Sequence, residues 1–204
     1  MSCNKLNRRA GFYYRSAPIV TLAKLIEHFY HRALTESEGG NGESTCLLHY
    51  KEGENMTAEQ LWSKFAEKNG IKHNEYEAWQ FGDAPDKLAE LVLRGIKTGT
   101  ASAEELYKID NEPIPTEGEY SVILNSRDEA VCVIRTTKVY IVPFCDVSAH
   151  HAFCEGEGDR SLAYWRKVHE EFFRDEYDAC GLEFSQDIPV VCEEFELLMK
   201  AAEC

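Results

Sequence analysis

Residues 120–142, with the sequence YSVILNSRDEAVCVIRTTKVYIV, carry the clearest structural signal in this chain. It contains two strand-like runs, 120–124 and 130–142, which are rich in β-branched residues. A third run, 190–199, carries Glu193, Glu194 and Glu196 among apolar residues, as expected of a strand with one face in water. Together the runs predict a β-sheet.

Helical signals surround these strands. Thr57 and Gln60 form a capping box, and Gly95 follows a second helical pattern for which Asp83 is the candidate cap. Four helices are expected, over residues 57–70, 85–94, 147–153 and 161–177. Because helices and strands do not alternate regularly, we expect an α+β fold with a mixed or barrel-like sheet.

The balance between acidic and basic residues changes near Met56 of the 204-residue chain. The net charge is −14 in total, +1 over residues 1–55 and therefore −15 over residues 56–204. Residues 19–33 favour a short helix, and the Gly-rich run 36–44 is typical of a linker. We expect residues 1–55 to be a poorly ordered or non-native N-terminal extension, with the start at Met56 as one explanation, and residues 56–204 to form one domain.

The composition excludes several classes of protein. An acidic chain is a poor match for duplex DNA held by a broad basic face, and no apolar run is long enough to span a membrane. The eight cysteines include no CxxC pair and are too sparse for a disulfide scaffold. We expect reduced cysteines and a cytoplasmic protein.

The segment GIKTGTAS, residues 95–102, is more polar than a core requires. It lacks the GxxxxGK[ST] spacing of a phosphate-binding P-loop, and it follows a helix instead of preceding one. It offers one cation, Lys97, and the hydroxyls of Thr98, Thr100 and Ser102. The alternatives are a functional loop and an ordinary turn from helix to strand. If the segment continues as a strand, Lys97 lies on the face opposite to the hydroxyls unless Gly99 bends the chain.

The segment EGEGDRSL, residues 155–162, places three carboxylates in five positions. Asp159 or Ser161 as a helix cap is the structural interpretation, and a carboxylate facing a lysine or a metal is the functional one. The spacing of a calcium loop is absent.

A third segment, 164–174, has an apolar stripe at helical spacing that is typical of a core. Arg166 and His169 are candidates to line a cleft beside this stripe. His150 and His151 are adjacent and form no pair at i, i+4, so histidine ligation of a metal has little support.

The chain contains five motifs in the order in which they occur in the ASCH domain, and it therefore resembles this family, which is related to the PUA RNA-binding domains. The motifs are WQFGD at 79–83, GIKTGT at 95–100, PTEGEY at 115–120, EGEGDRSL at 155–162 followed by Trp165, Arg166 and His169, and VCEEF at 191–195. The resemblance covers residues 56–199. It implies a small PUA-like β-barrel with flanking helices and a cleft that carries the GxKxxT residues.

The resemblance also implies the site. Family members include RNA-binding proteins, ribonucleases and amidohydrolases acting on N4-acetylcytidine, in which a Lys, a Thr and a Glu form the catalytic set. These correspond here to Lys97, Thr100 and Glu155, with Glu157 as the alternative carboxylate. Further residues are expected to contact substrate: Phe81, Asp83, Gly95, Ser102, Glu157, Arg160, Trp165 and Arg166. Trp79, Phe81 and Trp165 are the candidates for stacking on a base.

We therefore expect a cleft that binds a nucleoside or single-stranded RNA, with hydrolysis of an acylated nucleoside as the leading function. The alternatives are a non-catalytic RNA-binding module and a metal-dependent ribonuclease using Glu155, Glu157 and Asp159. No cofactor is expected, apart from a divalent metal in the ribonuclease case. The acidity of the domain favours a small ligand over a long polyanion.

Overall fold

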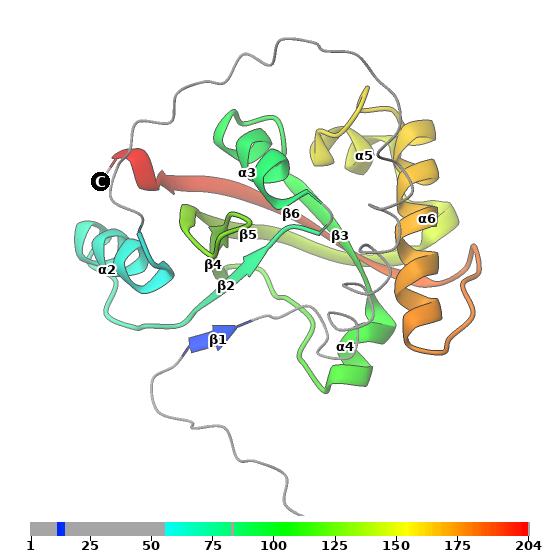
Figure 1. Cartoon of the computed structure of the whole chain (residues 1–204), viewed down its shortest axis with the longest axis horizontal. Coiled ribbons are helices and arrows are strands. Elements are labelled where there is room, and N and C mark those ends of the chain that lie inside the picture. The colour runs from blue at the N-terminus through cyan, green and yellow to red at the C-terminus, as the bar shows by residue number, and fades with distance from the viewer. Residues whose placement is uncertain (1–11, 15–55, 83, 204) are drawn as a thin grey trace, which may run out of the picture.

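A computed structural model describes residues 12–14, 56–82 and 84–203 (Figure 1). Its sheet has six strands in the order β1-β2-β4-β5-β6-β3. The strands are β1 Phe12–Tyr14, β2 Tyr76–Gln80, β3 Gly99–Ala103, β4 Tyr120–Leu124, β5 Ala130–Pro143 and β6 Pro189–Lys200. The α-helices are α2 Ala58–Asn69, α3 Pro85–Leu93, α4 Glu104–Asp110, α5 Ala149–Glu155 and α6 Leu162–Ala179. Two short 3-10 helices, Phe144–Asp146 and Ala201–Glu203, complete these elements.

The sheet is mixed, which confirms the expected α+β class. β2 pairs in parallel with β1 and with β4, whereas the β4–β5, β5–β6 and β6–β3 pairs are antiparallel. The long β5–β6 pair shifts register at two places, next to Val133 and next to Thr136. Because such bulges increase local twist and bend, the sheet curves into a half-barrel.

The central strands lie where the sequence predicts them. β4 has the expected bounds, and β5 and β6 extend the expected runs by one residue at one end and at both ends, respectively. β2 and α4 were not expected. Each is short, with five and seven residues, and too short for a hydrophobic period to stand out.

The helices follow their capping signals. Thr57 and Gln60 form the capping box of α2, which ends at the left-handed Gly70. Ser148 and Ser161 cap α5 and α6. α3 begins at Pro85 without a side-chain cap; its candidate cap Asp83 lies outside the described residues.

Three apolar clusters hold the helices on the sheet. α2 packs through Trp62 and Phe65 at one end of the sheet, while α5 and α6 pack around Phe144 and Phe173 at the other (Figure 1). α3 buries Leu88 and its neighbours against the middle strands. The polar segments 95–102 and 155–162 meet between α3 and the α5–α6 pair.

Several predictions fall outside what the structure describes. The helix expected over 19–33 and the linker over 36–44 lie in residues that are not described, so the boundary at Met56 stays a prediction. No disulfide joins the cysteines of the described part. Among the helices of the described ranges, none is both long and apolar enough to cross a bilayer.

Candidate functional site

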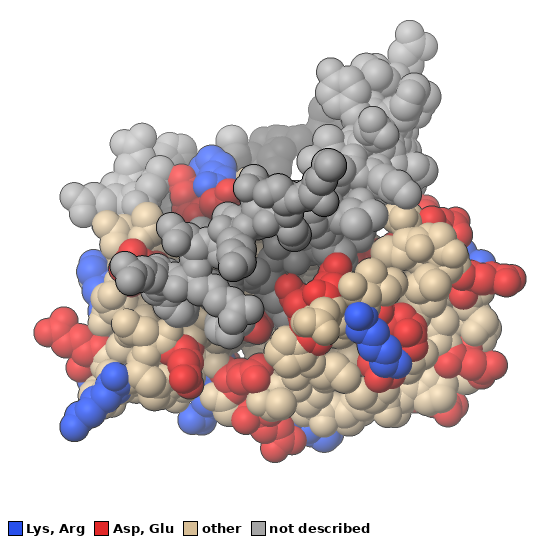
Figure 2. All heavy atoms as spheres, turned by 90° about the horizontal axis from the view of Figure 1, so that it is seen from below, with Lys and Arg blue, Asp and Glu red and all other residues tan. Residues whose placement is uncertain are grey.

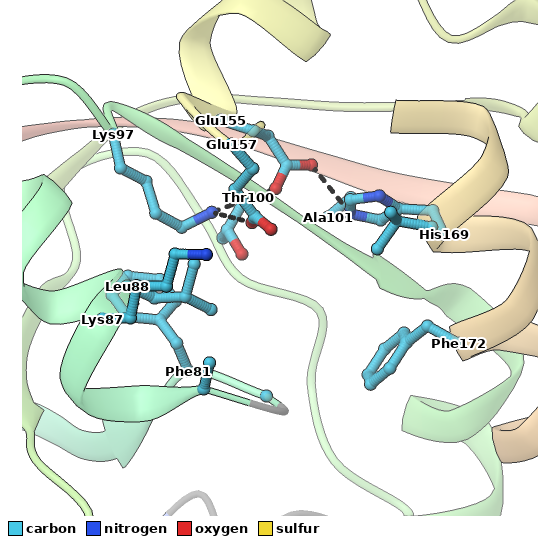
Figure 3. A pocket seen from close by; sticks show the side chains of 13 residues that line it. Phe81, Lys87, Leu88, Lys97, Thr100, Ala101, Glu155, Glu157, His169 and Phe172 are labelled. Carbon is cyan, nitrogen blue, oxygen red and sulfur yellow. Dashed lines mark hydrogen bonds and ion pairs between the residues drawn. The ribbon is translucent and has the colours of Figure 1, made fainter. Parts of the chain in front are cut away.

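A pocket of about 120 Å³ lies between α3, the start of β3 and the α5–α6 pair (Figure 3). Polar and aromatic side chains from all of these elements line it: Phe81, Lys87, Lys97, Thr100, Glu155, Glu157, His169 and Phe172. Three of the motifs found in the sequence therefore converge on one cavity.

Lys97 reaches the pocket because the end of α3 is closed tightly. Gly95 adopts a left-handed φ of 68°, and the backbone N–H groups of Ile96 and Lys97 both donate to the carbonyl of Leu91. The next residue, Thr98, donates its N–H to the carbonyl of Cys154 at 2.7 Å. The loop is thus fixed between α3 and the end of α5.

The glycines of EGEG are required by packing. Gly156 ends α5 with a φ of 75°, and a Cβ at this position would lie 2.6 Å from the carbonyl oxygen of Ile96. A Cβ on Gly158 would lie 2.4 Å from the ring of Tyr164. The glycines let the acidic loop approach the lysine loop and α6, which brings the two carboxylates of the loop to the pocket.

Lys97 is buried between these carboxylates. Its side chain is 1% exposed, and its Nζ lies 3.0 Å from Glu155 Oε2 and 3.2 Å from Glu157 Oε1. The ammonium also lies 5.0 Å from the centre of the Phe81 ring, within cation–π range. Lys97 thus forms ion pairs with two carboxylates inside the protein.

Glu155 is the most densely contacted group of the site. Its Oε1 accepts a hydrogen bond of 2.7 Å from Trp165 Nε1, and the Nε2 atoms of His151 and His169 each lie 3.3 Å from the same oxygen. Complete burial by itself raises the pKa of Glu155, but the charges of Lys97 and His169 and the two imidazole rings beside its Oε1 outweigh this effect. The pKa is therefore held well below its usual range. Glu155 is a carboxylate at neutral pH.

Both ring nitrogens of His169 lie close to polar groups of the site. Nδ1 lies 3.0 Å from the backbone carbonyl of Trp165, and because a carbonyl can only accept, Nδ1 must donate. Nε2 lies 3.3 Å from the Glu155 carboxylate. The ring stacks on Trp165 at a centroid distance of 4.2 Å, so His169 is held beside Glu155 from two sides.

Thr100 lies half-buried on β3 and lines the same pocket. Within the described residues its hydroxyl makes no hydrogen bond, whereas Thr98 Oγ1 bonds to the carbonyl of Cys154 and Ser102 Oγ to Tyr107 Oη. Of the three hydroxyls in the loop, Thr100 alone lines the pocket. Lys97 shares the pocket with Thr100 because regular strand alternation begins only at Gly99.

The family model of the ASCH domain matches residues 77–199. The chain belongs to the ASCH domain family. Its fold is accordingly that of the PUA-like group, as the sequence motifs predicted.

Two solved structures support this assignment. The ASCH domain from Lactobacillus crispatus JV V101 is 33% identical, with a TM-score of 0.63, and the match covers 69% of this chain and 91% of that one. Protein EF3133 from Enterococcus faecalis V583 is 35% identical, with a TM-score of 0.66, and the match covers 71% and 90% of the two chains. A search of curated proteins finds no match.

In this ASCH domain the predicted catalytic set comes together. Lys97, Thr100 and Glu155 all line the pocket, as do Phe81 and Glu157. The ambiguity between Glu155 and Glu157 is explained by the geometry, because both carboxylates contact Lys97. The roles of these residues stay predictions.

Other predicted contact residues of the ASCH domain lie outside the pocket lining. Gly95 forms the turn after α3, and Ser102 is turned toward Tyr107. Arg160 donates to the carbonyl of Phe153 and covers its ring, and Arg166 donates to the carbonyl of Cys145. Asp83 lies outside the described residues.

Trp165 contributes to the site in a different way from the one expected. Its ring is 2% exposed and packs between Phe144 and His169, so it offers no stacking surface in this conformation. Instead its indole N–H holds Glu155. Trp79 lies against the edge of Phe81. The aromatic walls of the pocket are Phe81 and Phe172.

The residue set suggested for a metal-dependent ribonuclease does not converge. Asp159 accepts a hydrogen bond from the N–H of Ser161 at the start of α6, and Lys97 occupies the position between Glu155 and Glu157. The structural interpretation of Asp159 and Ser161 as capping residues is thus the better one.

Sequence reasoning missed several members of the site, among them Lys87 and Phe172 of the pocket lining and His151 behind it. His151 is fully buried, with its Nδ1 3.2 Å from Tyr140 Oη and its Nε2 facing Glu155. The signal was the i, i+4 spacing of His151 and Glu155, which places both on one face of a helix.

Proposed function

We propose that the pocket of this ASCH domain binds a nucleobase and hydrolyses the amide of an acylated nucleoside such as N4-acetylcytidine. The observation that carries the proposal is the buried Lys97, which is held by two carboxylates in the pocket that Thr100 also lines. Such a unit supplies a nucleophile, a fixed positive charge and a proton acceptor in one cavity.

The reaction begins with attack of Thr100 Oγ1 on the acyl carbonyl carbon. The hydroxyl proton passes to Glu157, whose side chain is 22% exposed and therefore less enclosed than that of Glu155. The ammonium of Lys97 stabilises the negative charge that develops on the carbonyl oxygen. Collapse of the intermediate returns the proton to the leaving amine, and water then hydrolyses the acyl-threonine ester.

Glu155 acts in this scheme as a positioning residue. It is already contacted by Trp165, His151 and His169, and it holds the Lys97 ammonium in place from the side away from solvent. A lysine fixed in this way needs no reorganisation when the oxyanion forms, which is the condition for efficient electrostatic stabilisation.

The volume of the pocket and the net charge of the chain both favour a small, uncharged ligand. The pocket volume of about 120 Å³ is below the roughly 300 Å³ at which pockets for drug-sized ligands begin. Phe81 and Phe172 offer apolar walls to a planar base. Acidic side chains are spread over the face seen in Figure 2 without a continuous basic patch, and the net charge of the chain is −14. A nucleoside carries no phosphate and is not repelled by this surface.

The test is release of cytidine and acetate from N4-acetylcytidine by the full chain, followed by liquid chromatography. We expect Thr100→Val and Lys97→Met each to lower kcat/KM by at least about 100-fold. Thr100→Ser keeps a hydroxyl and retains turnover. Full activity of Thr100→Val would overturn the proposed nucleophile.

Matched controls separate chemistry from folding. Thr137→Val changes an exposed threonine on β5, and Lys108→Met removes an exposed lysine on α4. Both are expected to retain the wild-type rate. Binding of the nucleoside without release of acetate by the wild-type chain would replace the hydrolase with the non-catalytic base-binding alternative.

A further inference from the structure

A second cluster of functional side chains lies on a different face of α5. His150 and Cys154 are four residues apart on the helix, and Glu194 faces them from β6. One ligand atom from each of the three lies within 4.8 Å of the others, the one such group of His, Cys, Asp and Glu among the described residues. None of the three lines the pocket of the proposed function.

The backbone brings these residues together independently of any ligand. Gly99 is the register partner of Glu194 in the β3–β6 pair, and a Cβ on Gly99 would lie 3.2 Å from the Cβ of Cys154. The carbonyl of Cys154 accepts the N–H of Thr98 at 2.7 Å. α5 is thus fastened next to Glu194 by contacts that involve none of the three functional groups.

Two of the three distances between the ligand atoms are close to those of a tetrahedral metal site. Cys154 Sγ lies 3.6 Å from His150 Nε2, and His150 Nε2 lies 3.7 Å from Glu194 Oε1. For Zn²⁺ with ordinary bond lengths, tetrahedral geometry requires about 3.5 Å between sulfur and nitrogen and about 3.3 Å between nitrogen and oxygen. The third distance, from Cys154 Sγ to the Glu194 carboxylate, lies within 4.8 Å, against the roughly 3.5 Å that tetrahedral geometry requires, so the Glu194 side chain has to move toward the sulfur when the ion binds.

The charges are also suited to a divalent cation. A thiolate and a carboxylate together neutralise Zn²⁺, and a Cys, His and Glu set matches the borderline softness of this metal. Without a metal, Glu194 is neutralised by Lys138, whose Nζ lies 3.0 Å from Glu194 Oε1. The Lys138 side chain is 54% exposed, so it can move away when a metal binds.

We propose that His150, Cys154 and Glu194 bind a zinc ion, with the fourth coordination position open to water because the His150 side chain is 66% exposed. Cys154 directly precedes Glu155, so the ion clamps the end of α5 onto β6 beside the pocket. The inference does not depend on the proposed hydrolase activity, since its ligands lie outside the pocket.

The test uses the full metal-free, reduced chain titrated with Co²⁺. We expect one equivalent to produce the near-ultraviolet absorption of a cobalt–thiolate bond, and Zn²⁺ to displace the cobalt and raise the unfolding temperature. Cys154→Ser is expected to abolish the thiolate band, whereas Cys180→Ser retains it. A band that persists in Cys154→Ser, or no band in the wild type, would overturn the proposal.

Two further variants address folding and competition. His150→Ala changes an exposed side chain and is expected to leave the fold intact while weakening Zn²⁺ binding by more than about 100-fold, since loss of a ligand costs more than loss of a supporting group. Lys138→Met removes the competing cation and is expected to strengthen binding. Unchanged Zn²⁺ affinity in His150→Ala would contradict the assigned ligand set.

Discussion

At the scale of single residues, the site depends on the charge of Glu155. This carboxylate is 1% exposed and contacts Lys97, Trp165, His151 and His169. A buried charge is tolerated only when partners replace the lost water, and here each partner comes from a different turn or element. Glu155 therefore joins α5, α6 and the lysine loop through one group.

Replacing Glu155 with Gln is expected to lower the free energy of unfolding by about 3–5 kcal/mol, because it leaves Lys97 buried beside a neutral amide. Chemical denaturation measures the loss. Glu157→Gln is the matched control, since its side chain is 22% exposed and its loss is expected to be smaller. Equal losses for the two variants would show that burial of Glu155 is not the cause.

The pH dependence of stability follows from the same residue. The pKa of Glu155 in the folded chain lies well below its ordinary value of 4.5, since Lys97 and the histidines outweigh the effect of burial. Its stabilisation is therefore complete above pH 4.5 and is lost as the pH falls through the lower folded-state pKa. We expect the free energy of unfolding to fall more steeply below pH 4.5 in the wild type than in Glu155→Gln, measured by denaturation at several pH values.

At the scale of elements, the end of α5 determines whether the acidic loop can reach Lys97. Gly156 combines a left-handed φ of 75° with a close approach to Ile96. Gly181, after α6, has nearly the same φ of 72° but has no atom within 4 Å of its would-be Cβ. The two glycines therefore separate the cost of conformation from the cost of a steric clash.

We expect Gly181→Ala to cost about 1–2 kcal/mol of stability, the penalty for a left-handed residue with a Cβ. Gly156→Ala is expected to cost more and also to reduce turnover in the proposed reaction, because the clash with Ile96 moves Glu155 and Glu157 away from Lys97. Denaturation and the nucleoside assay measure the two effects. Equal destabilisation with unchanged turnover would contradict the close packing at Gly156.

At the scale of the whole molecule, the net charge of −14 favours an uncharged ligand over a polyanion. Binding of an uncharged nucleoside releases no counterions, so we expect its dissociation constant to change less than about twofold between 50 and 200 mM salt. Isothermal titration calorimetry with N4-acetylcytidine and the Thr100→Val variant measures this value without turnover. A steep salt dependence, together with tighter binding of single-stranded RNA, would favour the RNA-binding alternative.

The local structure could be predicted from short stretches of the sequence. Thr57 and Ser161 cap helices where expected, and the apolar runs of β4, β5 and β6 lie within a residue of their predicted bounds. These features depend on hydrogen bonds and side-chain periods within a few residues, so a local pattern contains them. The ordered motifs also identified the family and five residues that line its pocket: Phe81, Lys97, Thr100, Glu155 and Glu157.

Contacts between groups that are distant in the sequence depend on tertiary packing. Lys97 and Glu155 are 58 positions apart, and their contact depends on how α3 and α5 pack on the sheet. Because of the same packing, Trp165 is a buried hydrogen-bond donor to Glu155 and not the stacking surface that was expected. The packing also places Glu194 of β6 next to His150 and Cys154 of α5. Contacts between distant segments depend on strand order and helix placement, and residue spacing within a single segment carries no information about either.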